Sequence, residues 1–393
     1  MFSTKKKRAM LLVSSGIAIA FALSACSSST PSAGSSASSS STAKPAVKLT
    51  HVVVATPNTA TSPQSANFEL PVELGYYKAL GLDVEFQNLG TPQAVLGALA
   101  TGKADFGIEN DQSMVATEAQ GQSIGGTAFY EFTYPFKYGV AVSPTSKVTK
   151  LSQLKNTTVG TDAFGQSEYT LGQKMLALEG VTADDVHWLA TGVGVASGQA
   201  LQKGQISALF YSDSGFGQII SAGIPLRFLS IPKGVPQVGG QMVVASNNIW
   251  SKHRSLATNL ATAINETNVF IKANPTAASY AYLQQFPTAA PAGETLKQQI
   301  ASVSLPLQLR LKLYTPPAGS NLQPGGIYAS SLKESVTFGN LPASTDVSKL
   351  YSTAITKDAN KFSVAAVQKQ AAAYKVPGIK GQVAIPKVPK NTP

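Results

Sequence analysis

The sequence predicts a two-lobed α/β protein, in which each lobe is a mostly parallel sheet flanked by helices and two crossing strands join the lobes. Three observations support this prediction. Short apolar strands alternate with helical stretches from about residue 48, and this order favours a parallel sheet covered by helices. The same alternation begins again near residue 157. The body of about 345 residues also exceeds one ordinary domain, so two halves are expected.

The first half of the body shows the alternation most clearly. Its expected strands cover residues 49–55, 82–89 and 105–108, and its expected helices cover residues 71–80 and 91–101. Gly81 and Gly102 directly follow the two helices, where glycine favours the left-handed conformation of a helix C-cap. The order strand, helix, strand, helix, strand is typical of a parallel sheet.

The second half repeats the pattern. Strands are expected at residues 157–160, 186–190 and 208–211, and helices at 166–178 and 198–203. Two further apolar, extended stretches at 138–142 and 241–245 flank this half and are expected to be the crossing strands. From residue 250 the sequence is helical, with Leu256, Leu260, Ile264 and Ile271 on one face. Beyond about residue 305 the pattern predicts only helical stretches near 347–356 and 364–374.

These elements place the lobes on the chain. Lobe 1 is expected to be discontinuous and to comprise residues 48–139 and 241–375. Lobe 2 is expected to comprise residues 140–240. Residues 376–393 are rich in Pro, Gly and Lys and are expected to be a flexible tail.

The N-terminal 47 residues have the pattern of an export and anchoring segment. Lys5 to Arg8 precede an apolar run from Leu11 to Leu23, which is the order of an export signal over residues 1–25. The run of about 13 residues is shorter than the roughly 20 that cross a bilayer. Leu23 to Cys26 resembles the bacterial lipobox, so Cys26 is the expected lipidation site. Residues 26–47 are rich in Ser, Ala and Thr and are expected to be a disordered tether.

Composition and charge exclude several classes of function. The formal net charge of +11 falls to +7 without the four cations of the signal. The remaining Lys and Arg are scattered, whereas nucleic-acid binding needs a clustered basic surface. No nucleic-acid partner is therefore expected. Cys26 is the only cysteine, so an intrachain disulfide is excluded.

Five motifs resemble one known family. Residues 73–85, ELGYYKALGLDVE, resemble the pattern G-Y-F-x-x-x-G-L-D-V-E, and residues 98–107, ALATGKADFG, resemble A-L-x-x-G-x-x-D-F-G. Residues 150–160 resemble a third pattern, L-K-G-K-x-V-G. Gly180-Val181 with Asp185-Val186, and residues 200–208, complete the set. Together they resemble the periplasmic solute-binding proteins of ABC transporters for sulfonate, nitrate, taurine and thiamine-pyrimidine precursors. Ser207 stands where that family usually has Asp.

The resemblance implies a two-lobed type II periplasmic-binding-protein fold and a function in solute import. The chain is expected to bind a small-molecule solute between its lobes and deliver it to ABC permease subunits. With the lipid on Cys26 it would lie at the extracytoplasmic face of the cell membrane, as a monomer and without a cofactor. Two alternatives stay open, namely an enzyme of pyrimidine biosynthesis on the same scaffold and a sensor or adhesion lipoprotein.

Candidate binding residues follow the ends of the predicted strands, because ligand crevices of open α/β sheets form there. The turn over residues 161–167 also presents backbone N–H groups at a helix start. Asp111 and Asp213 would make the cleft acidic, and Glu168 would repel an anion, so a nitrogenous, planar or cationic solute is expected. The candidates are Thr56, Pro57, Asn58, Asn110, Asp111, Phe164, Gly165, Gln166, Ser167, Tyr211 and Asp213.

Catalytic and metal motifs do not support a different function. Residues 192–198 contain glycines between a strand and a helix, but the third Gly is one residue late for a dinucleotide loop. His51, His187 and His253 are far apart in the sequence, so no metal site of the usual spacing is expected. The fragments around Ser167 and Ser214 do not match the Gly-x-Ser-x-Gly pattern of a serine hydrolase. The sequence therefore predicts a binding protein and not an enzyme.

Overall fold

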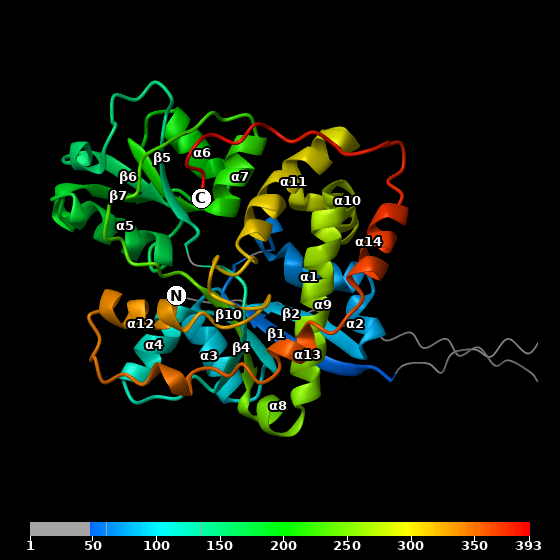
Figure 1. Cartoon of the computed structure of the whole chain (residues 1–393). Helices are drawn as coiled ribbons and strands as arrows, with labels where there is room; N and C mark the ends of the chain where they lie inside the picture. The colour runs from blue at the N-terminus through cyan, green and yellow to red at the C-terminus, as the bar shows by residue number, and fades with distance from the viewer. Residues whose placement is uncertain (1–47, 60, 135) are drawn as a thin grey trace, which may run out of the picture. The chain divides into compact units, whose positions relative to one another are not determined.

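The computed structural model describes residues 48–393 except Ala60 and Pro135, all within one compact unit (Figure 1). The predicted signal, Cys26 and the tether lie outside the described residues. Two five-stranded mixed sheets, each flanked by helices, form two lobes, which confirms the predicted α/β fold. In residues 48–393, apart from 60 and 135, no helix has both the length and the apolar character of a membrane span.

The sheet of lobe 1 has the strand order β2-β1-β3-β10-β4. Strands β1 (Thr50–Thr56), β2 (Leu82–Asn88) and β3 (Phe106–Asn110) are parallel, as the alternation with helices predicts. Strands β10 (Gln241–Ser246) and β4 (Gly126–Glu131) are antiparallel to their neighbours. The chain therefore returns to lobe 1 through β10, which lies inside the sheet between β3 and β4.

Two hydrophobic cores cover the faces of this sheet. The first core packs against α1 (Ala66–Glu73), α2 (Tyr76–Ala79), α9 (Arg254–Ala273), α10 (Pro275–Gln285), α13 (Thr356–Ala359) and α14 (Val364–Ala373). The second packs against α3 (Pro92–Ala100), α4 (Asp111–Ala119) and α12 (Ala329–Phe338). A short helix, α8 (Asn247–Lys252), follows β10. The predicted helix over residues 71–80 is split, because Gly75 adopts a φ of 77° between α1 and α2.

The sheet of lobe 2 has the strand order β7-β6-β8-β5-β9. Strands β6 (Thr158–Thr161), β7 (His187–Ala190) and β8 (Ala208–Ser212) are parallel. Strands β5 (Tyr138–Val142) and β9 (Arg227–Phe228) pair antiparallel. Helix α5 (Ser167–Leu178) packs on one face, and α6 (Val195–Gln202) and α7 (Asp213–Ser221) pack on the other.

Helix α11 (Leu296–Lys312) joins the two lobes, although the sequence pattern did not predict it. Its residues Ile300, Val303 and Leu307 lie in a lobe 1 core, whereas Leu305 and Leu309 lie in the core around α7. The two backbones approach closely, because a Cβ added at Gly217 of α7 would lie 2.7 Å from the Cα of Pro306. Helix α11 is therefore part of both lobes.

Residues 376–393 are packed against both lobes, which corrects the expectation of a flexible tail. On lobe 1, the backbone N–H of Val383 donates to Thr276 Oγ1 at 2.8 Å, and Val383 is 8% exposed. Farther along, Ile385 and Val388 pack against the core around α7. Pro393 lies 3.1 Å from the position of a Cβ added at Gly139 in β5. Figure 1 shows this segment, in red, running from α14 over α11 to its end beside α7.

Candidate functional site

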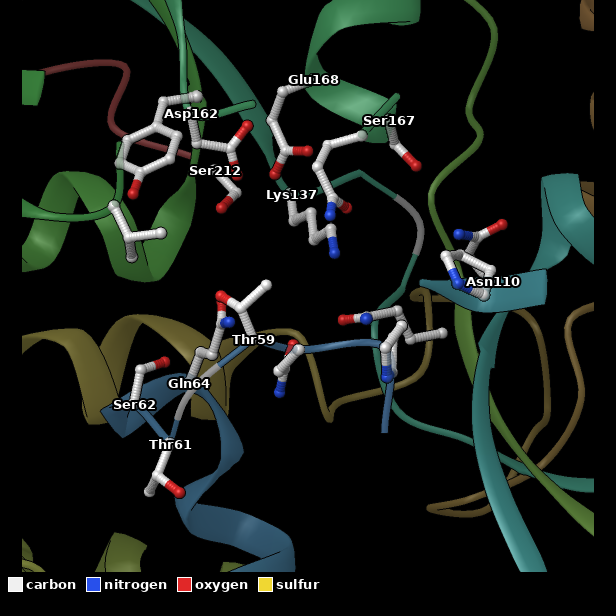
Figure 2. A pocket seen from close by; sticks show the side chains of 17 residues that line it. Thr59, Thr61, Ser62, Gln64, Asn110, Lys137, Asp162, Ser167, Glu168 and Ser212 are labelled. Atoms are coloured by element: carbon white, nitrogen blue, oxygen red, sulfur yellow. The ribbon is translucent and has the colours of Figure 1, made fainter. Parts of the chain in front are cut away.

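A polar cavity of about 140 Å³ lies between the lobes (Figure 2). By the volume that one buried water occupies, it has room for on the order of ten water molecules. The cavity is small enough to enclose one small polar molecule. Its lining residues are Pro57, Asn58, Thr59, Thr61, Ser62, Gln64, Pro92, Asn110, Lys137, Asp162, Gln166, Ser167, Glu168, Val193, Tyr211, Ser212 and Gln241.

Strand ends explain why these residues meet. Residues 57–64 follow β1, Asn110 ends β3, Asp162 follows β6 and Ser212 ends β8. In each sheet the parallel strands present their carboxyl ends at one edge, which is where open α/β sheets bind ligands. The cavity is therefore formed where the carboxyl edges of the two sheets face each other.

The lobe 1 wall of the cavity carries neutral hydrogen-bonding groups. Figure 2 shows Thr59, Thr61, Ser62 and Gln64 on this side, below the space that the side chain of Lys137 enters. Asn58 is held in place, because its Nδ2 donates to Ser65 Oγ at 3.0 Å. This wall offers amide and hydroxyl groups, which can donate or accept hydrogen bonds, but no formal charge.

The lobe 2 wall carries two carboxylates. Asp162 lies in the turn after β6, and its Oδ1 accepts a hydrogen bond from Ala163 N at 2.8 Å. Glu168 lies in the first turn of α5 and is 8% exposed. Burial, and then the negative charge of Glu168, raise the pKa of Asp162 above its ordinary value. The two acids thus oppose each other's ionisation, and a cation placed between them would favour the charged form of Asp162.

Among the lining residues of the cavity, Lys137 has the cationic side chain. It lies on the segment that crosses from β4 to β5, and its side chain extends into the space between the walls (Figure 2). The residue is 8% exposed. Burial, and then the positive charge of Arg310, lower the pKa of Lys137 to about 8. Its Nζ also lies 5.3 Å from the centroid of the Tyr138 ring.

Six of the eleven predicted site residues line the cavity. They are Pro57, Asn58, Asn110, Gln166, Ser167 and Tyr211. Tyr211 is 3% exposed, and its hydroxyl accepts a hydrogen bond from Gly194 N at 2.6 Å. The five other predicted residues, Thr56, Asp111, Phe164, Gly165 and Asp213, do not line it.

Asp213 is the clearest correction. It was expected to face a ligand cation, but Arg310 of α11 already occupies that position. Arg310 Nε donates to Asp213 Oδ2 at 2.8 Å and Nη2 donates to Oδ1 at 2.7 Å. Burial raises the pKa of Asp213, but the charge and hydrogen bonds of Arg310 outweigh it and hold this pKa below its ordinary value. Asp213 therefore links lobe 2 to α11 and is not available to a solute.

The carboxylate of Asp111 is likewise hydrogen-bonded within the protein. Its carboxylate accepts from Gly239 N at 3.2 Å and from Gln112 N at 2.9 Å, and the residue is fully buried. Burial raises its pKa to about 7. Gly239 lies on the second segment between the lobes, so Asp111 fixes that segment to lobe 1. The acidic side chains that line the cavity are Asp162 and Glu168.

The three remaining predicted residues lie near the cavity without lining it. Thr56 is 2% exposed and its Oγ1 donates to Asn88 Oδ1 at 2.6 Å. Phe164 is 58% exposed. Gly165 lines a neighbouring hollow between α4, α5 and α12.

Sequence reasoning missed Lys137 and the roles of Asp162 and Glu168. Asp162 was within the turn identified at residues 161–167 but was not a candidate, and Glu168 was expected to repel an anion but was not named as a binding residue. A signal for Lys137 was present, since a lone cation precedes the apolar run 138–142 at the expected crossing point. Metal binding has no support in the described part of the chain, where no group of three His, Cys, Asp or Glu side chains is arranged to hold an ion.

Comparison with known families shows which protein family the chain belongs to. A family model described as "NMT1/THI5 like" matches residues 62–278. The chain belongs to this family. No curated protein sequence matches it. The family match runs from the loop after β1 to the start of α10, and leaves β1, helices α11 to α14 and residues 376–393 outside.

Solved structures show the same fold at low sequence identity. A protein from Bordetella bronchiseptica is 20% identical with a TM-score of 0.57, and the match covers 79% of this chain and 97% of that one. The alkanesulfonate-binding protein SsuA from Xanthomonas axonopodis pv. citri, bound to MOPS, is 16% identical with a TM-score of 0.53, covering 81% and 98%. A periplasmic sulfonate-binding protein from Methylobacillus flagellatus is 14% identical with a TM-score of 0.50, covering 85% and 99%. These likenesses establish the two-lobed periplasmic-binding-protein fold.

Proposed function

We propose that the protein is the solute-binding component of an ABC importer, held at the extracytoplasmic face of the membrane by a lipid on Cys26. It captures one small organic solute between its lobes and delivers it to the permease subunits as a monomer. The observation that supports this proposal is the polar cavity between the lobes, to which both lobes and one crossing segment contribute side chains. Such a site changes shape whenever the lobes move, so capture and release follow from one hinge motion.

A cationic nitrogen on the solute is supported by the lobe 2 wall. Asp162 and Glu168 are partly or largely buried carboxylates, and burying a charge is costly unless it gains a partner. A cationic group between them would supply that partner. A simple anion would be repelled by both.

Enzymatic function on the same scaffold has less support. The pyrimidine-biosynthesis alternative requires a reactive histidine in the cleft, and His51, His187 and His253 are not among the lining residues. A sensor or adhesion role would use the same fold without a permease. It differs from import in that solute binding would not lead to uptake.

A ligand screen tests the binding function. Thermal unfolding and the fluorescence of Trp188 and Trp250 are measured against a metabolite library that includes amines, amino acids, pyrimidines and sulfonates. We expect saturable stabilisation by at least one charged nitrogenous solute. A flat response across every class would refute solute binding.

The anchor has a separate test. Replacement Cys26→Ser in the full chain removes the acyl acceptor, so the protein should move from the membrane fraction to the soluble fraction after export. Mass spectrometry of the wild-type N-terminal peptide should find diacylglycerol on Cys26. An unmodified, soluble wild-type protein would refute anchoring and leave the solute-binding proposal standing.

A further inference from the structure

The ionisable groups of the cavity are not paired with each other. Lys137 forms no salt bridge within 4.0 Å to a carboxylate among the described residues, and neither do Asp162 and Glu168 to a cation. By contrast, the buried Arg310 and Asp213 nearby are paired at 2.7 Å. Three ionisable side chains therefore face a shared cavity without an ion-pair partner, whereas the Arg310–Asp213 pair behind it is neutralised internally.

Each of these groups has room for a further partner. Asp162 uses Oδ1 for its bonds to Ala163 N and Thr161 Oγ1, while Oδ2 has no bond of this kind in the described structure. Lys137 has three N–H donors, and its pKa is lowered to about 8 by burial. A buried charge in this state gains from a hydrogen-bonding counter-charge.

The two acids and the ammonium of Lys137 also lie at different places along the cavity. Figure 2 shows Asp162 and Glu168 on the upper wall and the side chain of Lys137 below them, with its ammonium pointing down into the space between the walls. A solute in this space would meet two acids at one side and one cation, surrounded by neutral amides and hydroxyls, at the other. This arrangement is complementary to a molecule that carries opposite charges at its two ends.

We infer that the solute is amphoteric: it has a cationic nitrogen bound by Asp162 and Glu168 and, at its other end, a carboxylate or sulfonate group bound by Lys137. This inference rests on the proposed solute-binding function and narrows it. A purely anionic solute would pair with Lys137 but leave the two carboxylates opposed. A purely cationic solute would satisfy the carboxylates and place no acceptor on Lys137. Only an amphoteric solute pairs with both kinds of charge.

Size-matched probes test the inference on the wild-type protein. Each zwitterion, either an amino carboxylate or an aminoalkanesulfonate, is titrated beside the amine that lacks its acid group and the acid that lacks its amino group. We expect a zwitterion to bind at least ~10-fold more tightly than either matched probe, since a hydrogen bond to a charged group contributes about 1.5–3 kcal/mol. The two zwitterion series distinguish a carboxylate from a sulfonate.

Variants of the cavity residues test which side chain binds each end of the solute. Lys137→Met should weaken zwitterion binding ~10- to 100-fold, to the level of the matched amine, while binding of the amine itself stays the same or tightens. Glu168→Gln should weaken the zwitterion and the amine together. Lys203→Met, the same substitution at an exposed lobe 2 position outside the cavity, serves as the control and should leave all affinities unchanged.

The outcomes distinguish failure of the amphoteric solute from failure of solute binding itself. A tightest ligand that is singly charged or neutral overturns the amphoteric solute and leaves solute binding intact. An equal loss of zwitterion and amine binding in Lys137→Met also overturns it, because Lys137 would then only shape the cavity. Failure of every library compound to bind the wild-type protein overturns both proposals.

Discussion

Loss of the Arg310 side chain should be among the most damaging single changes in the protein. Arg310 is 2% exposed and Asp213 is 0% exposed, and two hydrogen bonds of 2.7 and 2.8 Å join them. Arg310→Met keeps most of the side-chain volume but leaves Asp213 as an uncompensated buried charge. Breaking a buried pair in this way costs about 3–5 kcal/mol, which for a body of this size corresponds to a loss of roughly 4–7 °C in the unfolding midpoint.

The pH dependence of this loss identifies its cause. In the wild type, Arg310 holds the pKa of Asp213 below its ordinary value, so the pair stabilises the fold at any pH above about 4. In Arg310→Met, burial without the cation raises that pKa instead. A carboxyl with a raised folded-state pKa is least costly when protonated, so the deficit should shrink between pH 7.5 and pH 5.

Two further variants make the assay decisive. The double variant Arg310→Met with Asp213→Asn removes both charges and should recover part of the lost stability. Arg254→Met is the control, because Arg254 is exposed and lies 4.6 Å from the Trp250 ring, and it should cost less than about 1 kcal/mol. Urea unfolding of all four proteins gives the comparison. A deficit below about 1 kcal/mol, or one that does not change with pH, would refute the reasoning.

Three other predictions follow from the packing and from buried acids. Gly217→Ala should cost about 1–3 kcal/mol by forcing α7 away from Pro306, whereas Gly97→Ala, with open space around its Cβ, should be neutral or stabilising in thermal unfolding. Burial raises the pKa of Glu109 from 4.5 to about 8, so the folded protein keeps a proton that the unfolded chain releases, and stability should fall as pH rises from about 4.5 to about 8 and level off above it. Glu109→Gln should flatten that slope in denaturant titrations. A variant ending at Lys375 should lose about 2 kcal/mol or more, the contribution of one or two buried aliphatic side chains, and an unchanged midpoint would show that the segment 376–393 is not bound.

The parallel part of each sheet could be predicted from sequence, because local periodicity determines it. In lobe 1, the predicted strand 82–89 and helix 91–101 differ from β2 and α3 by a residue or two at their ends. Strand alternation and glycine C-caps act within ten residues, so a single sequence displays them. What it does not display is the identity of sheet neighbours, such as the antiparallel insertion of β10 between β3 and β4.

The candidate site shows the same limit. Loops after strands were predictable positions, and Asn58, Asn110 and Gln166 follow from them. Which charges remain available to a solute depends on a residue 97 positions away, because Arg310 neutralises Asp213. Arg310 lies on α11, in the region for which the sequence pattern predicted no element, so the acids of the cleft were assigned to the wrong residues.

The contacts beyond the family match also restrict how the lobes can move. Helix α11 contributes Leu305 and Leu309 to the core of lobe 2 while Leu307 lies in a core of lobe 1, and separating either set would expose apolar side chains at a cost of about 1.5–3 kcal/mol each. The opposite flank, between the first turn of α5 and the helices α4 and α12, is a solvent-filled hollow that includes Ser167 and Phe338. Opening is therefore cheapest as a rotation that keeps α7 against α11 and widens this hollow. Such a rotation draws Asp162 and Glu168 away from the lobe 1 wall, so under the proposed binding function the capture of a charged solute and the closure of the lobes would be one event.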